Sequence, residues 1–154
     1  MKADIAASYL IYRLAGRYLS RQAGFLLAAF YVYNPAVFIN SALWGQVDSF
    51  FTLIVISAAV MLSERKVAAS AALFAAAVMM KLQGIIFLPV LFFELAGQRR
   101  ADVIFKAAAC ALGTAAAVAL PFSLNNGTLW IFKLFTSTAA EYPYSSVNAF
   151  NFFK

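Results

Sequence analysis

The sequence contains no histidine and a single cysteine, Cys110. Histidine is the commonest general base and the commonest metal ligand, so its absence excludes a Ser-His-Asp triad, a Cys-His dyad and a His-ligated zinc site within the chain. One cysteine can form neither an internal disulfide nor a cysteine-based metal site. Cys110 lies in an alanine-rich apolar segment, where a small buried side chain is the simplest interpretation.

Charged residues are also scarce. They make up 12% of the 154 residues, whereas 64% are hydrophobic, and the mean hydropathy is +0.82. Soluble domains contain about a quarter charged residues and about half apolar ones. We therefore expect an integral membrane protein that contacts the lipid bilayer. The net charge is +6, but the Lys and Arg residues form no stripe along one face, so the charge does not indicate nucleic-acid binding.

Six apolar segments are separated by short polar connections. They do not alternate apolar and polar residues with period two, so helices are expected rather than membrane strands. The predicted fold class is all-α, a polytopic transmembrane helical bundle in residues 1–122. Residues 123–154 are rich in aromatic and polar residues, and we expect an outer interfacial helix at 129–135 and an external loop from 139 in the same domain. The segments are residues 5–14, 23–33, 50–62, 67–80, 85–96 and 103–120.

Basic residues gather in alternate connections. Eight Lys and Arg residues lie in the first, third and fifth connections or in the adjoining ends of the segments, whereas the second, fourth and sixth connections contain one. The positive-inside rule then predicts that the odd connections are cytoplasmic and the even ones face outward. This topology leaves the N-terminus outside before a short first helix, so we expect that an upstream part of the protein is missing.

The second connection holds a polar turn, Trp44-Gly45-Gln46-Val47-Asp48. Pro35 ends the preceding helix at residue 34, and residues 36–43 are expected to form a short re-entrant or interfacial helix. Trp44 could stack on a sugar ring, Gln46 offers a donor and an acceptor, and Asp48 offers a carboxylate. Two simpler interpretations stay open, namely Asp48 as a helix N-cap and Trp44 as an interface anchor.

The fourth connection is a second polar turn that contains Lys81 and Gln83. A helix over residues 67–80 would rise only about 21 Å, which is short of a hydrocarbon core of about 30 Å. Either this turn lies below the membrane surface or residues 67–95 form one kinked helix. A charge at membrane depth is costly and indicates function. Lys81 suits a phosphate group, and snorkelling to the surface is the alternative. Glu94 is expected to pair with Arg99 or Arg100.

Several of these stretches resemble motifs of a known family. Residues 34–48 are similar to a block of bacterial membrane mannosyltransferases related to the GPI-anchor pathway, which belong to the GT-C superfamily of glycosyltransferases. Lys81-Leu-Gln-Gly with Pro89 resembles the block that follows, and residues 119–122 and 142–151 are also similar. The resemblance implies a GT-C-like fold and transfer of a hexose, specifically mannose, from a polyprenyl-phosphate-linked donor on the outer face of a bacterial plasma membrane.

The resemblance also implies roles for single residues. It places Trp44, Gln46 and Asp48 in the substrate pocket and Lys81 and Gln83 near the lipid phosphate. It also places three further residues in an outer loop over the site: Tyr144, Asn148 and Asn151.

The chain departs from this family in one respect. Such enzymes have their catalytic carboxylate in an upstream external loop, whereas only Asp4 precedes the first helix here. The catalytic residue stays unassigned, with Asp48 as a weak candidate, and we expect a partial chain that needs an N-terminal segment or a partner chain. A flippase of lipid-linked sugars and a non-catalytic membrane subunit remain alternatives, because broken helices also mark transporters. No cofactor is certain from the sequence; a lone aspartate is weak evidence for a divalent metal, which stays open.

Overall fold

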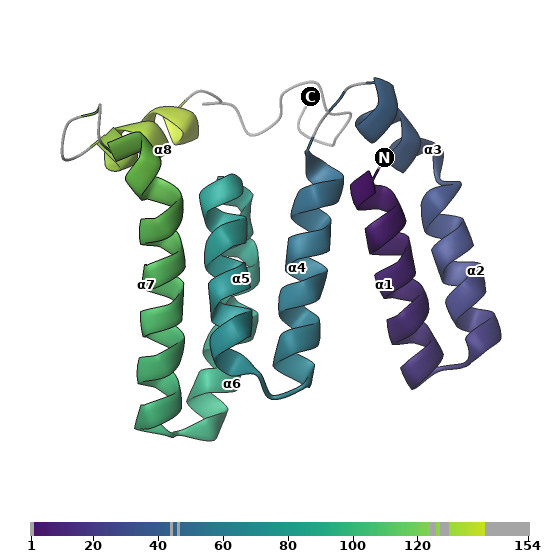
Figure 1. The fold of residues 1–154 in the computed structure, drawn as a ribbon, viewed down its shortest axis with the longest axis horizontal. Helices are drawn as coiled ribbons and strands as arrows, with labels where there is room; N and C mark the ends of the chain where they lie inside the picture. Colours follow the sequence, from purple (N-terminus) through teal and green to yellow (C-terminus); the bar gives the residue numbers. More distant parts are fainter. Residues whose placement is uncertain (1, 44, 46, 124–125, 127–129, 141–154) are drawn as a thin grey trace, which may run out of the picture. The chain divides into compact units, whose positions relative to one another are not determined.

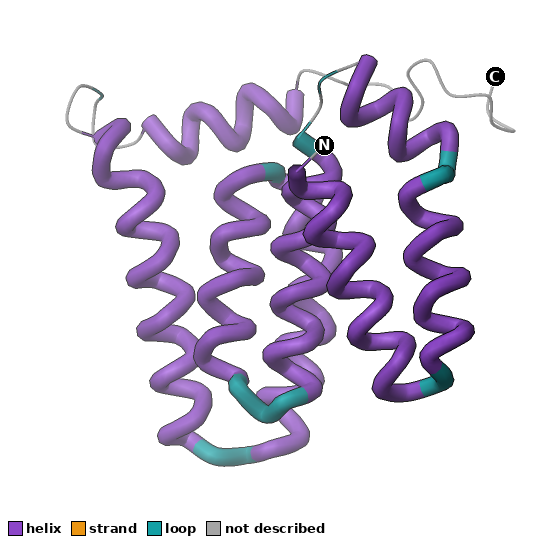
Figure 2. The backbone as a smooth tube through the Cα atoms, turned by 45° about the vertical axis from the view of Figure 1, so that its right-hand side comes forward, coloured by secondary structure: helices purple, strands orange, loops and turns teal. Residues whose placement is uncertain are grey.

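The computed structural model describes residues 2–43, 45, 47–123, 126 and 130–140. Over these residues the chain is helical, with short loops and no strand (Figure 2), which confirms the predicted all-α class. Contacts divide the chain into two units, Met1–Ala115 and Ala116–Lys154, and helix α7 passes from the first into the second.

Each predicted apolar segment overlaps a helix of the structure. The fourth matches its helix residue for residue, and the fifth is divided between a 3₁₀ helix and an α-helix. The elements are α1 (Lys2–Tyr18), α2 (Arg21–Val32), α3 (Pro35–Phe38), the π-helix η1 (Ile39–Leu43), α4 (Asp48–Ser63), α5 (Val67–Met80), the 3₁₀ helix η2 (Leu82–Phe87), α6 (Leu88–Gln98), α7 (Ala101–Ser123) and α8 (Trp130–Ala140).

In the first unit, α1 and α2 form a tight hairpin, and α1 also packs on α4 (Figure 1). The hairpin is close because Gly24 has no side chain. A Cβ atom there would lie 2.8 Å from the carbonyl oxygen of Tyr12 and 3.0 Å from the backbone nitrogen of Gly16. Ser20 caps the start of α2 by accepting a hydrogen bond of 3.1 Å from the backbone N–H of Ala23.

Helices α4 and α5 form the centre of the first unit. The hydroxyl of Ser70 is buried and donates a hydrogen bond of 2.8 Å to the carbonyl of Ala58, which links the two helices. Phe74 of α5 is only 1% exposed. The apolar core also includes residues from α4, α5, α6 and α7: Leu62, Val67, Leu91, Leu95 and Ala107.

The chain reverses direction at Lys81. Helix α5 ends at Met80, Lys81 is extended with φ −151° and ψ 125°, and η2 then packs back against α5. Gly84 allows this close return, since a Cβ atom there would lie 2.7 Å from the backbone nitrogen of Val78. The chain therefore turns at Lys81, and the alternative of one kinked helix over residues 67–95 is wrong.

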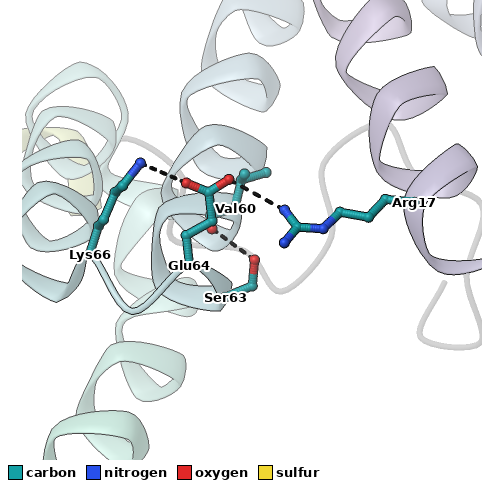
Figure 3. A network of polar contacts seen from close by, with 5 residues as sticks. All are labelled: Arg17, Val60, Ser63, Glu64 and Lys66. Atoms are coloured by element: carbon teal, nitrogen blue, oxygen red, sulfur yellow. Dashed lines mark hydrogen bonds and ion pairs between the residues drawn. The ribbon is translucent and has the colours of Figure 1, made fainter.

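Charged residues meet at the other end of this unit. The carboxylate of Glu64 accepts a hydrogen bond of 2.7 Å from Lys66 and a longer one of 3.5 Å from Arg17 of α1 (Figure 3). The hydrogen bond from Lys66 and the charge of Lys66, with a smaller contribution from Arg17, lower the pKa of the Glu64 carboxyl. These contacts join the end of α1 to the turn between α4 and α5.

The predicted pairing of Glu94 with Arg99 or Arg100 is wrong. Its carboxylate contacts Arg65 at 3.0 Å and accepts from the side-chain amide of Gln98 at 2.7 Å, instead of pairing with Arg99 or Arg100. Arg65 lies at φ 62° in the tight turn before α5, which brings its long side chain within reach of α6. Arg100 is occupied elsewhere, because it pairs with Asp102 at 2.9 Å.

In the second unit, α8 begins at Trp130 in the described part of the chain. The indole N–H of Trp130 donates to the hydroxyl of Ser123 at 3.0 Å, and its ring lies 6.2 Å from that of Phe122. The predicted helix at 129–135 exists but continues to Ala140, so the expected loop does not start at 139. Alanine has the highest helix propensity, which favours this extension.

One helix of the described residues, α7, is long and apolar enough to cross a membrane by length and composition. Helix α2 and residues Pro35–Leu43 would make a second candidate span if they crossed the membrane as one unit, although they bend by 48° at their junction. Helices α4, α5 and Leu82–Gln98 are apolar but shorter. Many large apolar side chains are exposed, among them Phe25, Leu26, Phe30, Phe92, Phe93 and Phe105. An exposed apolar surface of this kind is typical of a protein that contacts lipid or another chain.

We predict that Gly84→Ala destabilises the protein by about 1–3 kcal/mol, because the new methyl group would meet the backbone of α5. Gly97→Ala is the matched control, since nothing lies within 4 Å of a Cβ atom at that helical position. Thermal unfolding in detergent measures both variants. Equal midpoints for Gly84→Ala and Gly97→Ala would show that η2 does not pack closely on α5.

Candidate functional site

The two polar turns meet at one end of the first unit. The ammonium of Lys81 donates a hydrogen bond to one carboxylate oxygen of Asp48, although the residues lie 33 positions apart. The side-chain amide of Asn40 donates to the other oxygen of Asp48 at 2.9 Å. The Lys81 and Asp48 side chains are 34% and 33% exposed, so the pair is half-buried and accessible to a ligand.

Asp48, the acidic member of this pair, is the first residue of α4. Val47 is the N-cap, and no side chain caps the helix, so the alternative of Asp48 as the N-cap is wrong. Its two oxygens bond instead to Lys81 and Asn40. A carboxylate in the first turn is also stabilised by the positive end of the helix dipole. Gly45, at φ 65°, supplies the left-handed backbone conformation in the preceding turn.

Asn40 comes from an irregular helix. Asn34 caps α3 by accepting from the backbone N–H of Ala36 at 2.9 Å, and Pro35 occupies the first turn. The predicted short helix at 36–43 is therefore present, but its second half is the π-helix η1. A π-helix is rare and is frequently found at functional sites, because it alters which side chains share a face.

A second hydrogen-bond network lies beside the first. Asp4 of α1 accepts from the hydroxyl of Ser49 and from that of Ser41 at 2.8 Å, and the two hydroxyls lie 2.6 Å apart. Asn40 and Ser41 are neighbours in the chain, as are Asp48 and Ser49, so the two networks run side by side. We refer to Asp4, Asn40, Ser41, Asp48, Ser49 and Lys81 together as the polar cluster.

A cavity of about 520 Å³ opens beside the polar cluster. One wall is apolar and includes Ala36, Val37 and Ile39, whereas Asn40 and Asp48 lie on the polar side. Such a site can hold a molecule that has both hydroxyl groups and a hydrocarbon part. The full lining is Tyr31, Ala36, Val37, Ile39, Asn40, Asp48, Ser49 and Thr52.

Sequence reasoning found part of this cluster. It singled out Asp48 and Lys81, but it did not assign Asp4 to the site. Asn40 and Ser41 lie within residues 34–48, the stretch that resembles a family motif, and each bonds to a residue eight positions along, Asp48 and Ser49 respectively. Asp4 had no such signal, since its contacts depend on how α1 packs on α4.

Of the other predicted site residues, the structure describes one. Gln83 is exposed on η2, two residues beyond Lys81. Five others lie outside the described residues: Trp44, Gln46, Tyr144, Asn148 and Asn151. Among the described residues, no group of three or more His, Cys, Asp and Glu side chains is placed to hold a metal ion.

A model of glycosyltransferase family 87 matches residues 3–151. Because this match covers almost the entire chain, the protein belongs to glycosyltransferase family 87, a family of membrane glycosyltransferases. The expected glycosyltransferase class is thereby confirmed. No curated protein and no solved structure matches the chain.

We predict that a double-mutant cycle with Asp48→Asn and Lys81→Met gives a coupling free energy of about 1 kcal/mol, as expected for a half-buried ion pair. The free energy of unfolding in detergent, measured for both single variants and the double variant, provides the value. Strictly additive effects would contradict a direct contact between the two side chains.

Proposed function

We propose that the protein is a membrane hexosyltransferase that uses a polyprenyl-phosphate-linked sugar, specifically mannose, and that the polar cluster binds this donor. The observation that supports the proposal most strongly is the contact between Lys81 and Asp48 beside the cavity of about 520 Å³. A cation, hydroxyl groups and an apolar wall together match the phosphate, the sugar and the isoprenoid of such a donor.

Lys81 is the proposed partner of the lipid phosphate. An ammonium has three N–H donors, and Asp48 uses one of them, so the others are available to phosphate oxygens. When the bond between the sugar and the phosphate breaks, negative charge grows on the leaving phosphate. A positioned cation stabilises that charge more in the transition state than in the bound substrate, and this difference accelerates the reaction.

Asp48 is proposed to position Lys81 and to bind sugar hydroxyls. Transfer with inversion needs a base that removes the proton of the acceptor hydroxyl. A carboxylate that already accepts hydrogen bonds from an ammonium and an amide is stabilised in its charged form and is a weak base. We therefore do not assign the role of base to Asp48.

The proposed orientation places the polar cluster on the extracytoplasmic side. Figure 1 shows the α1–α2, α4–α5 and α6–α7 connections, which are the predicted cytoplasmic ones, at the ends of these helices opposite the start of α4, where Asp48 lies. The positive-inside rule favours the cytoplasm for that end. The apolar wall of the cavity would then face the first isoprene units of a donor in the outer leaflet.

We predict that Lys81→Met lowers kcat for mannose transfer from polyprenyl-phosphate mannose by about 100-fold, which is the usual effect of losing one group that stabilises developing charge. The assay uses the purified protein, with radiolabelled donor and extracted membranes that supply acceptors. Lys106→Met is the control, because it removes a lysine side chain from α7, at a position outside the polar cluster.

Wild-type transfer by Lys81→Met would contradict the role of Lys81. Transfer from a nucleotide-activated sugar but not from the lipid-linked donor would contradict the proposed donor class. Movement of the labelled donor across proteoliposomes without transfer to an acceptor would instead favour the flippase alternative.

A further inference from the structure

A second charged cavity lies away from the polar cluster, in the hairpin of α1 and α2. It has a volume of about 550 Å³ and is lined by five residues, Tyr12, Arg13, Gly16, Arg17 and Arg21. Three of the five are arginines, and no carboxylate is part of the lining. This cavity, which we call the arginine cavity, belongs to the end of the unit where the basic connections gather.

The arginines are only partly neutralised within the described chain. Arg17 contacts Glu64 at 3.5 Å, whereas the hydrogen bond of Arg13 goes to the hydroxyl of Tyr9 at 3.2 Å. Among the described residues, no carboxylate forms an ion pair with Arg13 or Arg21. Arg13 and Arg17 are also four residues apart on one helix, a spacing at which like charges repel.

A larger cavity of about 770 Å³ at the turn before α5 makes a useful comparison. It contains Arg65, Lys66, Arg100 and Lys106, but the first three of these are paired with Glu94, Glu64 and Asp102 respectively. Its basic groups are thus mostly satisfied inside the protein. The arginine cavity differs because two of its three guanidinium groups have no acidic partner among the described residues.

We propose that the arginine cavity binds a phosphate group, supplied by the headgroup of an anionic phospholipid. Guanidinium groups present paired N–H donors that fit phosphate oxygens, and they remain charged at any physiological pH. Gly16 keeps the cavity open, since no atom lies within 4 Å of a Cβ atom at that position. Tyr9 and Tyr18 are exposed beside Arg13 and Arg17, and tyrosine favours the depth of lipid headgroups.

The test measures binding of fluorescent phosphatidic acid to the purified full chain in detergent. Arg21→Gln removes one proposed contact, and Gly16→Leu fills the cavity without changing any charge. Arg99→Gln is the matched control, because it removes one arginine from a basic connection without lining the arginine cavity. We expect affinity at least about tenfold weaker for Arg21→Gln, the usual consequence of losing a charged hydrogen bond, a similar loss for Gly16→Leu, and no change for Arg99→Gln.

Three results would overturn the proposal. Equal losses for Arg21→Gln and Arg99→Gln would show that only the overall positive charge attracts the lipid. Wild-type binding by Gly16→Leu would show that the cavity is not occupied. The third is the absence of any thermal stabilisation of the wild-type chain by phosphatidic acid or by inorganic phosphate.

The same thermal measurement distinguishes the two sources of phosphate. Stabilisation by phosphatidic acid alone identifies a lipid headgroup, as proposed. Equal stabilisation by inorganic phosphate in lipid-free detergent would identify the free anion as the ligand and retain the phosphate site. Thermal unfolding of Gly16→Leu without ligand shows whether the α1–α2 hairpin still folds, and Arg21→Gln provides an independent test if it does not.

Discussion

The contact between the ammonium of Lys81 and the carboxylate of Asp48 is the interaction on which the candidate site depends. It brings together two turns that are 33 residues apart, and it brings both of them next to Asn40. Each partner also compensates the other, because an unpaired charge at this half-buried position would be costly. The backbone makes the contact feasible, since Gly45 permits the turn before α4 and Gly84 permits the close return after α5.

The site is also supported from the first helix. Asp4 of α1 accepts hydrogen bonds from Ser41 and Ser49, which are the chain neighbours of Asn40 and Asp48. Movement of α1 would therefore disturb the residues that hold the ion pair. At the other end of the unit, Glu64 links α1 to the turn between α4 and α5 through Arg17 and Lys66 (Figure 3). Polar contacts thus fix α1 to α4 at both ends.

Much of the helical pattern could be predicted because apolar runs and their breaks are local properties of the sequence. The run from Val67 to Met80 is a helix with those bounds, and the polar residues after it do form a turn. Partners between distant elements could not be predicted in this way. Asp48 looked like a helix cap, and Glu94 looked like a partner of Arg99 or Arg100, because both interpretations used neighbours in sequence. Their actual partners, Lys81 and Arg65, become available only after the helices pack.

Cysteine crosslinking tests most directly whether the two polar turns share one site. The experiment places cysteines at positions 48 and 81 in a Cys110→Ala background and adds a short reagent that joins two thiols. We predict an efficient internal crosslink for Asp48→Cys with Lys81→Cys and none for Asp48→Cys with Lys106→Cys, a position on α7 that lines the cavity at the basic end. The absence of a crosslink in the first pair, in protein whose thiols still react singly, would contradict the shared site.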